Sequence, residues 1–208
     1  MRSLILISAV LSASQGWAAS AIVRDGSTIQ LADVTYRLDT IDAPAFDQIC
    51  IDEHADAWTC GVEARDQLAN LIGSHQVRCD DLGADPAYKK RHIGICSVEG
   101  ETVSLNQLMV RQGFALSLDP TMKARFKEDE ASAKDDRRGL WKGCFVAPQQ
   151  FRRGQKDGAL LGDSCRADKD REIRAVLFLE RWFCSEEDAQ AAGFRKAFNC
   201  RASDRGRM

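Results

Sequence analysis

The sequence lacks a strong excess of charge of either sign. Its 29 Lys and Arg residues nearly balance its 31 Asp and Glu residues, which gives a net charge of −2 at pH 7. Such a chain has no overall positive field that would attract nucleic acid, so any anion-binding site must be built locally. Internal repeats and low-complexity tracts are also missing, which excludes a repeat protein.

Long apolar runs are nearly missing too. The exception covers residues 4–11, between Arg2 and the small residues Ala18 and Ala19. This run is too short to span a bilayer, and the pattern predicts a secretory signal peptide over residues 1–19. A short buried N-terminal helix is the alternative. We therefore expect an exported protein, periplasmic or secreted, with no membrane span in the mature chain. About 190 residues remain, enough for one domain and a small appendage.

The sequence has no spacing typical of a zinc site. Its three histidines, His54, His75 and His92, are scattered, and no C-x₂-C pair occurs among the eight cysteines. Structural zinc sites use such short paired spacings, so zinc is not expected. An even number of cysteines in an exported chain predicts disulfide bonds instead.

One disulfide follows from strand pairing. The runs around Cys79 and Cys96 are predicted to pair as neighbouring antiparallel strands, and facing positions there have a separation that suits a disulfide. The other pairs follow only from proximity along the chain and could be permuted. They are Cys50 with Cys60, Cys144 with Cys165, and Cys184 with Cys200.

β-prone runs predominate before Glu99, and helical patterns predominate after it. Strands are expected over residues 22–31, as a hairpin that turns at Asp25-Gly26, and over residues 34–41, 76–80 and 92–98. A polar loop would join the last two strands. Helices are expected over residues 61–74, 103–113 and 119–139. This arrangement is compatible with a small Greek-key β-barrel of the OB type. The composition changes at Gly154, so we expect one domain over residues 20–153. Residues 154–208 would form a linker and a cysteine-containing tail.

Residues 36–48 carry a group of charges at the end of a predicted strand. Arg37 and Asp39 are two residues apart and would lie on one face, with Asp42 at the end of the strand. A cation and a carboxylate in this position could hold a phosphate and a divalent metal. The stretch is therefore a candidate active site, or what remains of one.

Five segments occur in the order found in thermonuclease-like (staphylococcal-nuclease-like) proteins, which this sequence resembles. They are DGSTIQL (25–31), YRLDTIDAP (36–44), KKRHIGIC (89–96), LNQLMVRQGFA (105–115) and EASAKDDRRGLW (130–141). The resemblance covers about residues 22–152 and implies an α+β fold: a five-stranded OB-type β-barrel with about three helices, here followed by a small disulfide-containing tail. Such tails occur in some exported relatives, and the family includes members named for succinoglycan biosynthesis.

The resemblance implies calcium-dependent hydrolysis of DNA and RNA phosphodiesters. In that family an acidic pair holds the metal, a Glu is the general base, and two Arg stabilise the charge of the phosphorane-like transition state. This division of labour is chemically sensible. A guanidinium offers a planar fork for phosphate oxygens, calcium needs hard oxygen ligands, and a water needs a base to lose its proton.

Carrying the family's roles over residue by residue identifies part of this site. Arg37 and Arg91 match the two phosphate-stabilising arginines. Asp42 matches a metal-binding Asp. Ala43 stands in place of a Thr that contributes only its backbone carbonyl to the metal, so this role survives the change.

Two of the family's essential carboxylates are missing. Ala45 stands where the family has its general-base Glu, and Ser27 stands where it has the second metal-binding Asp. Losing a positioned general base typically costs about 10²–10⁴ in rate, and losing an anionic ligand weakens a calcium site. Asp25, Asp39 and Asp47 are close in sequence, but we expect them to be solvated or turn carboxylates, not substitutes.

The sequence therefore favours an exported thermonuclease-like protein with a degraded active site. It would bind a phosphodiester or another polyanion, nucleic acid included, through Arg37 and Arg91, with little or no hydrolysis and at most weak Ca²⁺ binding. One alternative is a slow metal-dependent phosphodiesterase (nuclease) that uses Asp42. The other is an accessory role in exopolysaccharide (succinoglycan-type) biosynthesis, which rests on the family association alone.

Overall fold

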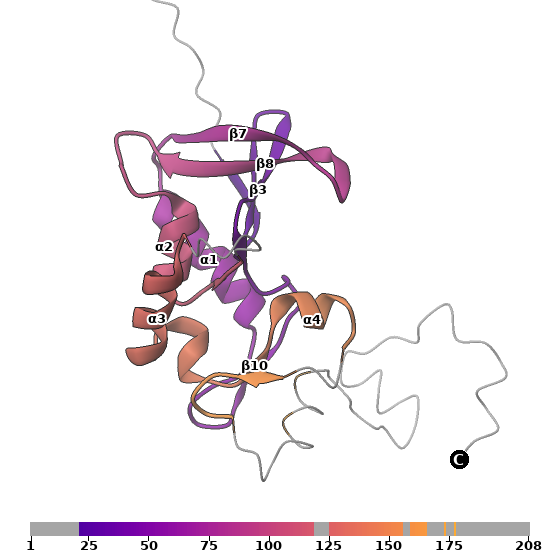
Figure 1. Ribbon diagram of the computed structural model, residues 1–208, viewed down its shortest axis with the longest axis vertical. Helices are drawn as coiled ribbons and strands as arrows, with labels where there is room; N and C mark the ends of the chain where they lie inside the picture. The colour runs from indigo at the N-terminus through magenta and orange to yellow at the C-terminus, as the bar shows by residue number, and fades with distance from the viewer. Residues whose placement is uncertain (1–20, 119–124, 156–158, 166–172, 174–176, 178–208) are drawn as a thin grey trace, which may run out of the picture.

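The computed structural model describes residues 21–118, 125–155 and 159–165, together with Ile173 and Leu177 (Figure 1). The predicted signal peptide and the predicted pair of Cys184 with Cys200 lie outside the described residues. Of the described helices, none has the length and apolar character that a membrane span requires.

A five-stranded mixed sheet is the framework of the fold. Its strands are β1 (Ile22–Asp25), β2 (Thr28–Leu31), β3 (Val34–Leu38), β7 (Val77–Asp85) and β8 (Tyr88–Val98), in the spatial order β1-β2-β3-β8-β7. Neighbouring strands are antiparallel except β3 and β8, which are parallel. The β7–β8 hairpin crosses β1–β3 steeply and projects beyond them (Figure 1).

Both predicted hairpins are present, and the second is longer than expected. β1 and β2 turn at Gly26 and Ser27, one residue later than the expected Asp25-Gly26, because Asp25 still pairs with Thr28. In contrast, most of the predicted polar loop over residues 81–91 belongs to β7 and β8, and only Pro86 and Ala87 connect the strands. Most of these residues are exposed on the projecting hairpin. Strand hydrogen bonds satisfy their backbone there, so apolar side chains are not required.

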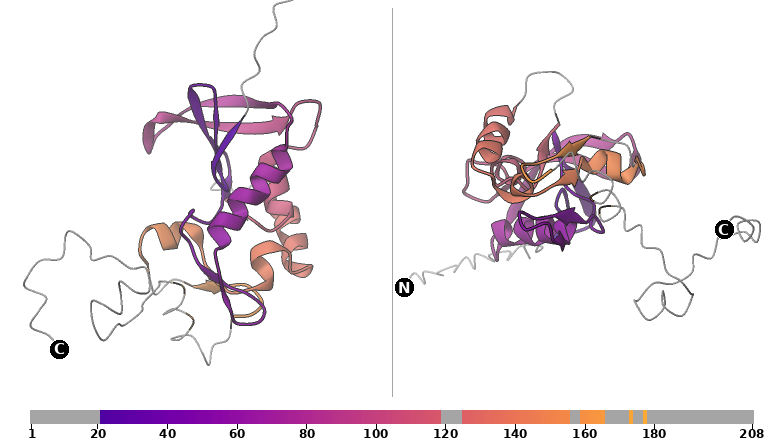
Figure 2. Two further views of the ribbon diagram at one scale, coloured as in Figure 1. Left: turned by 180° about the vertical axis from the view of Figure 1, so that it is seen from behind. Right: turned by 90° about the horizontal axis from the view of Figure 1, so that it is seen from below.

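Helices pack against the barrel and against one another. They are α1 (Cys60–Ile72), α2 (Leu105–Arg111), α3 (Lys127–Asp135) and α4 (Pro148–Arg152), and a 3₁₀ turn covers Gly139–Lys142. Seen from behind, α1 runs diagonally beneath the β7–β8 hairpin, with α2 and α3 beyond it (Figure 2). α3 begins later and ends earlier than the helix expected over residues 119–139, whose first residues lie outside the described ones. α4 comes in addition to the roughly three helices that the resemblance implied.

Three small strand pairs complete the fold. β4 (Ile41–Asp42) pairs with β9 (Leu116–Ser117), β5 (Cys50–Ile51) with β6 (Ala57–Trp58), and β10 (Phe145–Val146) with β11 (Leu160–Leu161). β11 lies within the predicted linker. This part of the linker is therefore paired with the domain instead of running free of it.

The buried apolar residues explain why these elements stay together. Ile29 and Leu38 from the sheet meet Leu68 of α1 and Met109 of α2 in the main core. A second cluster surrounds Phe145. A third joins strands β5 and β10 to Ile173 and Leu177, which come from beyond the predicted domain boundary. The strand order and the helices around it give the OB-type α+β fold that the resemblance implied.

Three disulfides link the described elements, and all three are pairs expected from the sequence. Cys79–Cys96 joins facing positions of β7 and β8. Cys50–Cys60 ties β5 to the first residue of α1. Cys144–Cys165 fastens the chain after β11 to the start of β10.

The Cys79–Cys96 bond closes a segment with a sequence separation of 17. Replacing both cysteines by serine should lower the free energy of unfolding by about 3 kcal/mol, because the unfolded chain gains the freedom that the bond removes. Denaturant unfolding of the double variant and the parent measures this loss. Peptide mapping under non-reducing conditions should link the two peptides, and free thiols at these positions in the folded protein would contradict the assignment.

Candidate functional site

The two candidate phosphate-binding arginines lie on adjacent parallel strands. Arg37 of β3 is opposite Ile93 of β8, and Thr35 is opposite Arg91. Side chains two residues apart on a strand share a face. Arg37 and Arg91 therefore lie diagonally next to each other on the same face of the sheet, as the proposed site requires.

A buried carboxylate that the sequence analysis did not identify pairs with Arg91. Asp85 at the end of β7 is 5% exposed, and its Oδ2 accepts from Arg91 Nε at 2.7 Å, with Arg91 Nη2 at 2.6 Å. The ring of Tyr88 lies 4.4 Å from the guanidinium carbon of Arg91. Arg91 is thus held in one position by a charged pair and an aromatic face.

The environment of Asp85 keeps it ionised. Burial by itself raises the pKa of this carboxyl group. The backbone N–H of Ala87, the hydrogen bond and charge of Arg91 and the charge of Arg37 outweigh that effect, so its pKa lies below the ordinary value of 3.8. Asp85 therefore holds Arg91 in place and offsets part of the positive charge of the two arginines.

Arg37 also reaches the strand that carries Asp42. Its Nη2 donates to the carbonyl oxygen of Ile41 at 3.3 Å. The tight turn between β3 and β4 makes this possible, with Thr40 in the left-handed region at a φ of 58°. A β-branched residue is rarely found there. Buried Asn106 fixes the turn by donating to the carbonyl oxygens of Asp39 (3.0 Å) and Gly94 (3.2 Å).

The β1–β2 turn lies beside Asp42 and Ala43. A Cβ atom at Gly26 would come within 2.9 Å of the Cβ of Ala43, so the turn packs directly against this residue. Ser27, the next residue, donates from its N–H (2.7 Å) and its hydroxyl (3.1 Å) to Asp25 Oδ1. Ser27 thus stands where the resemblance puts a metal ligand, while Asp25 accepts hydrogen bonds within its own turn.

The loop after Asp42 is fixed in place but carries no acid or base at Ala45. Buried Gln48 accepts from the N–H of Ala45 at 3.3 Å and donates to the carbonyl oxygen of Val146 at 2.8 Å. The absence of a side chain at Gly61 lets α1 approach this loop, because a Cβ there would meet the carbonyl oxygen of Ala45 at 1.8 Å. Asp47 is exposed on the same loop.

Asp42 is paired with an arginine that the sequence analysis also missed. Its Oδ1 accepts from Nη2 of Arg152, and its Oδ2 accepts from the backbone N–H of Gln149 at 2.9 Å. Nη1 of Arg152 donates to the carbonyl oxygen of Ala43 at 3.2 Å. The Asp42 side chain is 3% exposed and that of Arg152 is 41% exposed, so the carboxylate lies inside and the guanidinium closes over it.

The calcium ion that the resemblance implies does not fit these contacts. The carboxylate of Asp42 and the carbonyl of Ala43, the two expected ligands present, both accept from Arg152. Within the part of the chain that the structure describes, no group of three or more His, Cys, Asp or Glu side chains could hold a metal ion. Calcium needs six to eight oxygen ligands, and its affinity depends on their charge.

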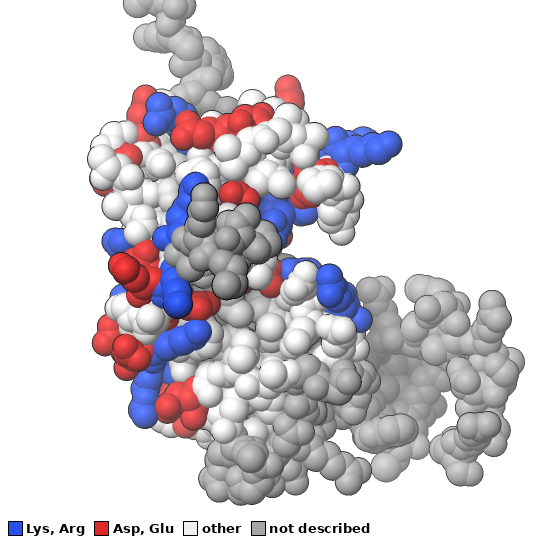
Figure 3. Space-filling model, in the orientation of Figure 1, with Lys and Arg blue, Asp and Glu red and all other residues white. Residues whose placement is uncertain are grey.

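The molecular surface is hollowed between the β7–β8 hairpin and α4 (Figure 3). In Figure 3 the surface is recessed between the tip of the β7–β8 hairpin and α4, and Lys and Arg atoms lie on both sides of the recess. Arg91 lies near the start of β8 in the hairpin, and Arg152 is the last residue of α4. A negatively charged, extended ligand suits such a surface.

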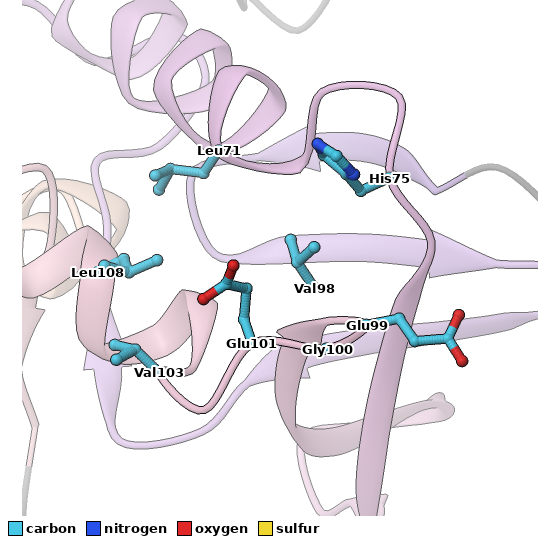
Figure 4. A pocket seen from close by; sticks show the side chains of 8 residues that line it. All are labelled: Leu71, His75, Val98, Glu99, Gly100, Glu101, Val103 and Leu108. Atoms are coloured by element: carbon cyan, nitrogen blue, oxygen red, sulfur yellow. The ribbon is translucent and has the colours of Figure 1, made fainter.

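A second hollow is not suited to an anion. Leu71, Val98 and Leu108 form an apolar floor there, and Glu99 and Glu101 lie around it (Figure 4). The two acidic side chains would repel a phosphate. This hollow is therefore a poorer candidate for phosphate binding than the arginine site.

Comparison with known proteins agrees with the fold described above. Residues 35–143 match the sequence profile of the family described as Staphylococcal nuclease homologue. The chain is also 32% identical over 124 residues to the Succinoglycan biosynthesis protein ExoI of Rhizobium meliloti (strain 1021). That alignment covers 59% of this chain and 63% of the relative, so it spans less than two thirds of the relative's length.

The family match extends from within β3 to just beyond the 3₁₀ turn and covers more than half of the chain. It contains Arg37, Asp42, Ala45 and Arg91, and it ends before Arg152. The chain belongs to the staphylococcal nuclease homologue family.

Proposed function

We propose that this chain is an exported polyanion-binding protein built on the nuclease fold, with little or no hydrolysis of its ligand. The observation that carries the proposal is the arrangement of Arg37 and Arg91 on one face of the sheet, where Arg91 is held by Asp85. Two guanidinium groups in this arrangement can bind phosphate or carboxylate oxygens. Neither group is suited to remove a proton from water, because an arginine stays protonated in proteins.

The identities of two further residues support binding over catalysis. Ala45 has no group that could act as a general base, and Ser27 has no negative charge to offer a metal. The pairing of Asp42 with Arg152 also disfavours the alternative of a slow phosphodiesterase, because that mechanism needs Asp42 for a metal. Export is supported by the three disulfides, since such bonds persist in oxidising compartments.

An accessory role in exopolysaccharide biosynthesis is the second candidate. It is favoured by the similarity to a protein named for succinoglycan biosynthesis. The two ideas are compatible, because arginines that contact backbone anions do not read the identity of a base. An acidic polysaccharide and a nucleic acid are therefore both reasonable probes for the site.

Binding should depend on Arg37 and Arg91. The measurement is a titration with a fluorescent single-stranded oligonucleotide, followed by fluorescence anisotropy in the presence of EDTA. Arg37→Ala and Arg91→Ala should each bind the oligonucleotide about tenfold more weakly than the parent, because each removes one charge-assisted contact. Each substitution should also reduce the steepness of a plot of log affinity against log salt concentration by about one. An acidic polysaccharide should compete with the oligonucleotide for the same site.

The matched control is Arg78→Ala, which removes the same charge from an exposed position on β7. Its affinity should stay close to that of the parent. Equal weakening in all three variants, or binding that does not respond to salt, would argue against a specific arginine site.

Turnover should be very slow. With calcium present, the purified protein should release nucleotides from DNA at least about 10²–10⁴ times more slowly than a family member that has the general-base Glu. Asp42→Ala should leave this residual rate unchanged. The proposal fails if DNA is cleaved at the rate of that comparison enzyme and the Asp42 variant abolishes the cleavage.

Replacing Asp85 should destabilise the fold in a pH-dependent way. At neutral pH, Asp85→Asn should lower the free energy of unfolding by about 1.5–3 kcal/mol, because a charged hydrogen bond to Arg91 is lost. The pKa of Asp85 is depressed in the folded state. The ionised carboxylate therefore contributes to the free energy of unfolding at a pH above the ordinary pKa of 3.8, and this contribution is lost as the pH falls below that value.

Denaturant unfolding at neutral and acidic pH measures this effect. The gap between the parent and Asp85→Asn should narrow on acidification. Asp80→Asn, at an exposed position on the same strand, is the control and should change the unfolding free energy by less than about 0.5 kcal/mol. A gap that is independent of pH would mean that Asp85 stabilises the fold by packing alone.

A further inference from the structure

We propose that Arg152 is a built-in cation that takes the place of the calcium ion of this fold, so that the chain cannot take up calcium at Asp42. The inference goes beyond the polyanion-binding proposal and does not depend on it. It rests on the contacts of one side chain and on the two oxygen donors that this side chain occupies.

The guanidinium of Arg152 contacts both expected metal ligands at once. One terminal nitrogen pairs with Oδ1 of Asp42, and the other donates to the carbonyl oxygen of Ala43 at 3.2 Å. The remaining carboxylate oxygen of Asp42 accepts from the backbone N–H of Gln149 at 2.9 Å. Each atom that could bind a metal from this side is therefore already an acceptor for α4.

The charge of Asp42 explains why one arginine is sufficient to neutralise the site. Asp42 is 3% exposed, and a carboxylate buried to this degree needs a cation or several hydrogen bonds. With Ser27 and Ala45 in place of the family's acids, Asp42 is the one carboxylate among the family's ligand positions. A single positive charge neutralises it, and the planar guanidinium fits two oxygen acceptors side by side.

Calcium and Arg152 cannot both contact Asp42. A divalent ion at the carboxylate would lie within a few ångströms of the guanidinium, and like charges repel strongly in a site with little solvent. Calcium also requires several negatively charged or carbonyl oxygens at once. Restoring the missing acids should therefore be insufficient for calcium binding while Arg152 remains.

Calcium titration of designed variants tests this inference. The parent and the double variant Ser27→Asp, Ala45→Glu should show no measurable calcium binding by isothermal titration calorimetry. The triple variant that adds Arg152→Ala should bind calcium at least about tenfold more tightly than the double variant. Calcium should also raise the melting temperature of the triple variant, since an ion that binds only the folded state stabilises it.

The control replaces Arg153 instead of Arg152 in the same background. Arg153 is exposed and adjacent, so its removal changes the net charge equally but leaves the contacts with Asp42 intact. This control should behave like the double variant. If Arg152→Ala prevents folding, Arg152→Gln, which removes the charge and keeps a polar side chain, is used in its place.

Three results would overturn the inference. The double variant could bind calcium as tightly as the triple variant, or the Arg153 control could gain the same affinity. A folded triple variant that binds no calcium would also contradict it, because Asp42 and Ala43 would then not lie at a metal position. None of these measurements includes a polyanion, so failure of the binding proposal would be seen separately.

Discussion

The neutralisation of one buried carboxylate is the constraint on which the site depends. Asp42 ends a short strand within the barrel, and its side chain is almost fully withdrawn from solvent. Its partner Arg152 comes from a separate short helix 110 residues later in the chain. The charge pair therefore joins the barrel to the C-terminal part of the domain. Removing Arg152 would leave the buried carboxylate of Asp42 without its cation, which costs stability because a buried charge needs a partner.

Charge compensation also organises the proposed phosphate-binding side of the site. Arg37 and Arg91 lie on parallel strands, and two like charges so close together repel each other unless an anion lies nearby. Asp85 provides that anion from the end of the β7–β8 hairpin. A ligand that arrives with further negative charge competes with Asp85 for the same donors. The site is thus preorganised for an anion, while the buried carboxylates prevent an excess of positive charge in the free protein.

Local patterns in the sequence were sufficient to predict much of the fold. The first hairpin, α1 and the facing positions of Cys79 and Cys96 all follow from periodicity and strand pairing. The length of the β7–β8 hairpin could not be predicted, because its exposed residues lack a regular alternation of apolar and polar side chains. Arg152 was missed because α4 has five residues, too few for a helical pattern, and because its partner is distant in sequence. Asp85 was missed for a related reason, since nothing local marks a loop carboxylate that folding will bury.

A guanidinium can replace a metal structurally without replacing it chemically. Arg152 is always charged and is part of the chain, so the geometry around Asp42 does not vary with the calcium concentration. A bound metal can also lower the pKa of a coordinated water and polarise a phosphoryl oxygen. A guanidinium has no coordination position for water, and its hydrogen bonds to Asp42 and Ala43 already use both terminal nitrogens. The proposed exchange of the ion for an arginine would therefore preserve the shape of the nuclease site and its attraction for anions, while the means of activating water would be lost.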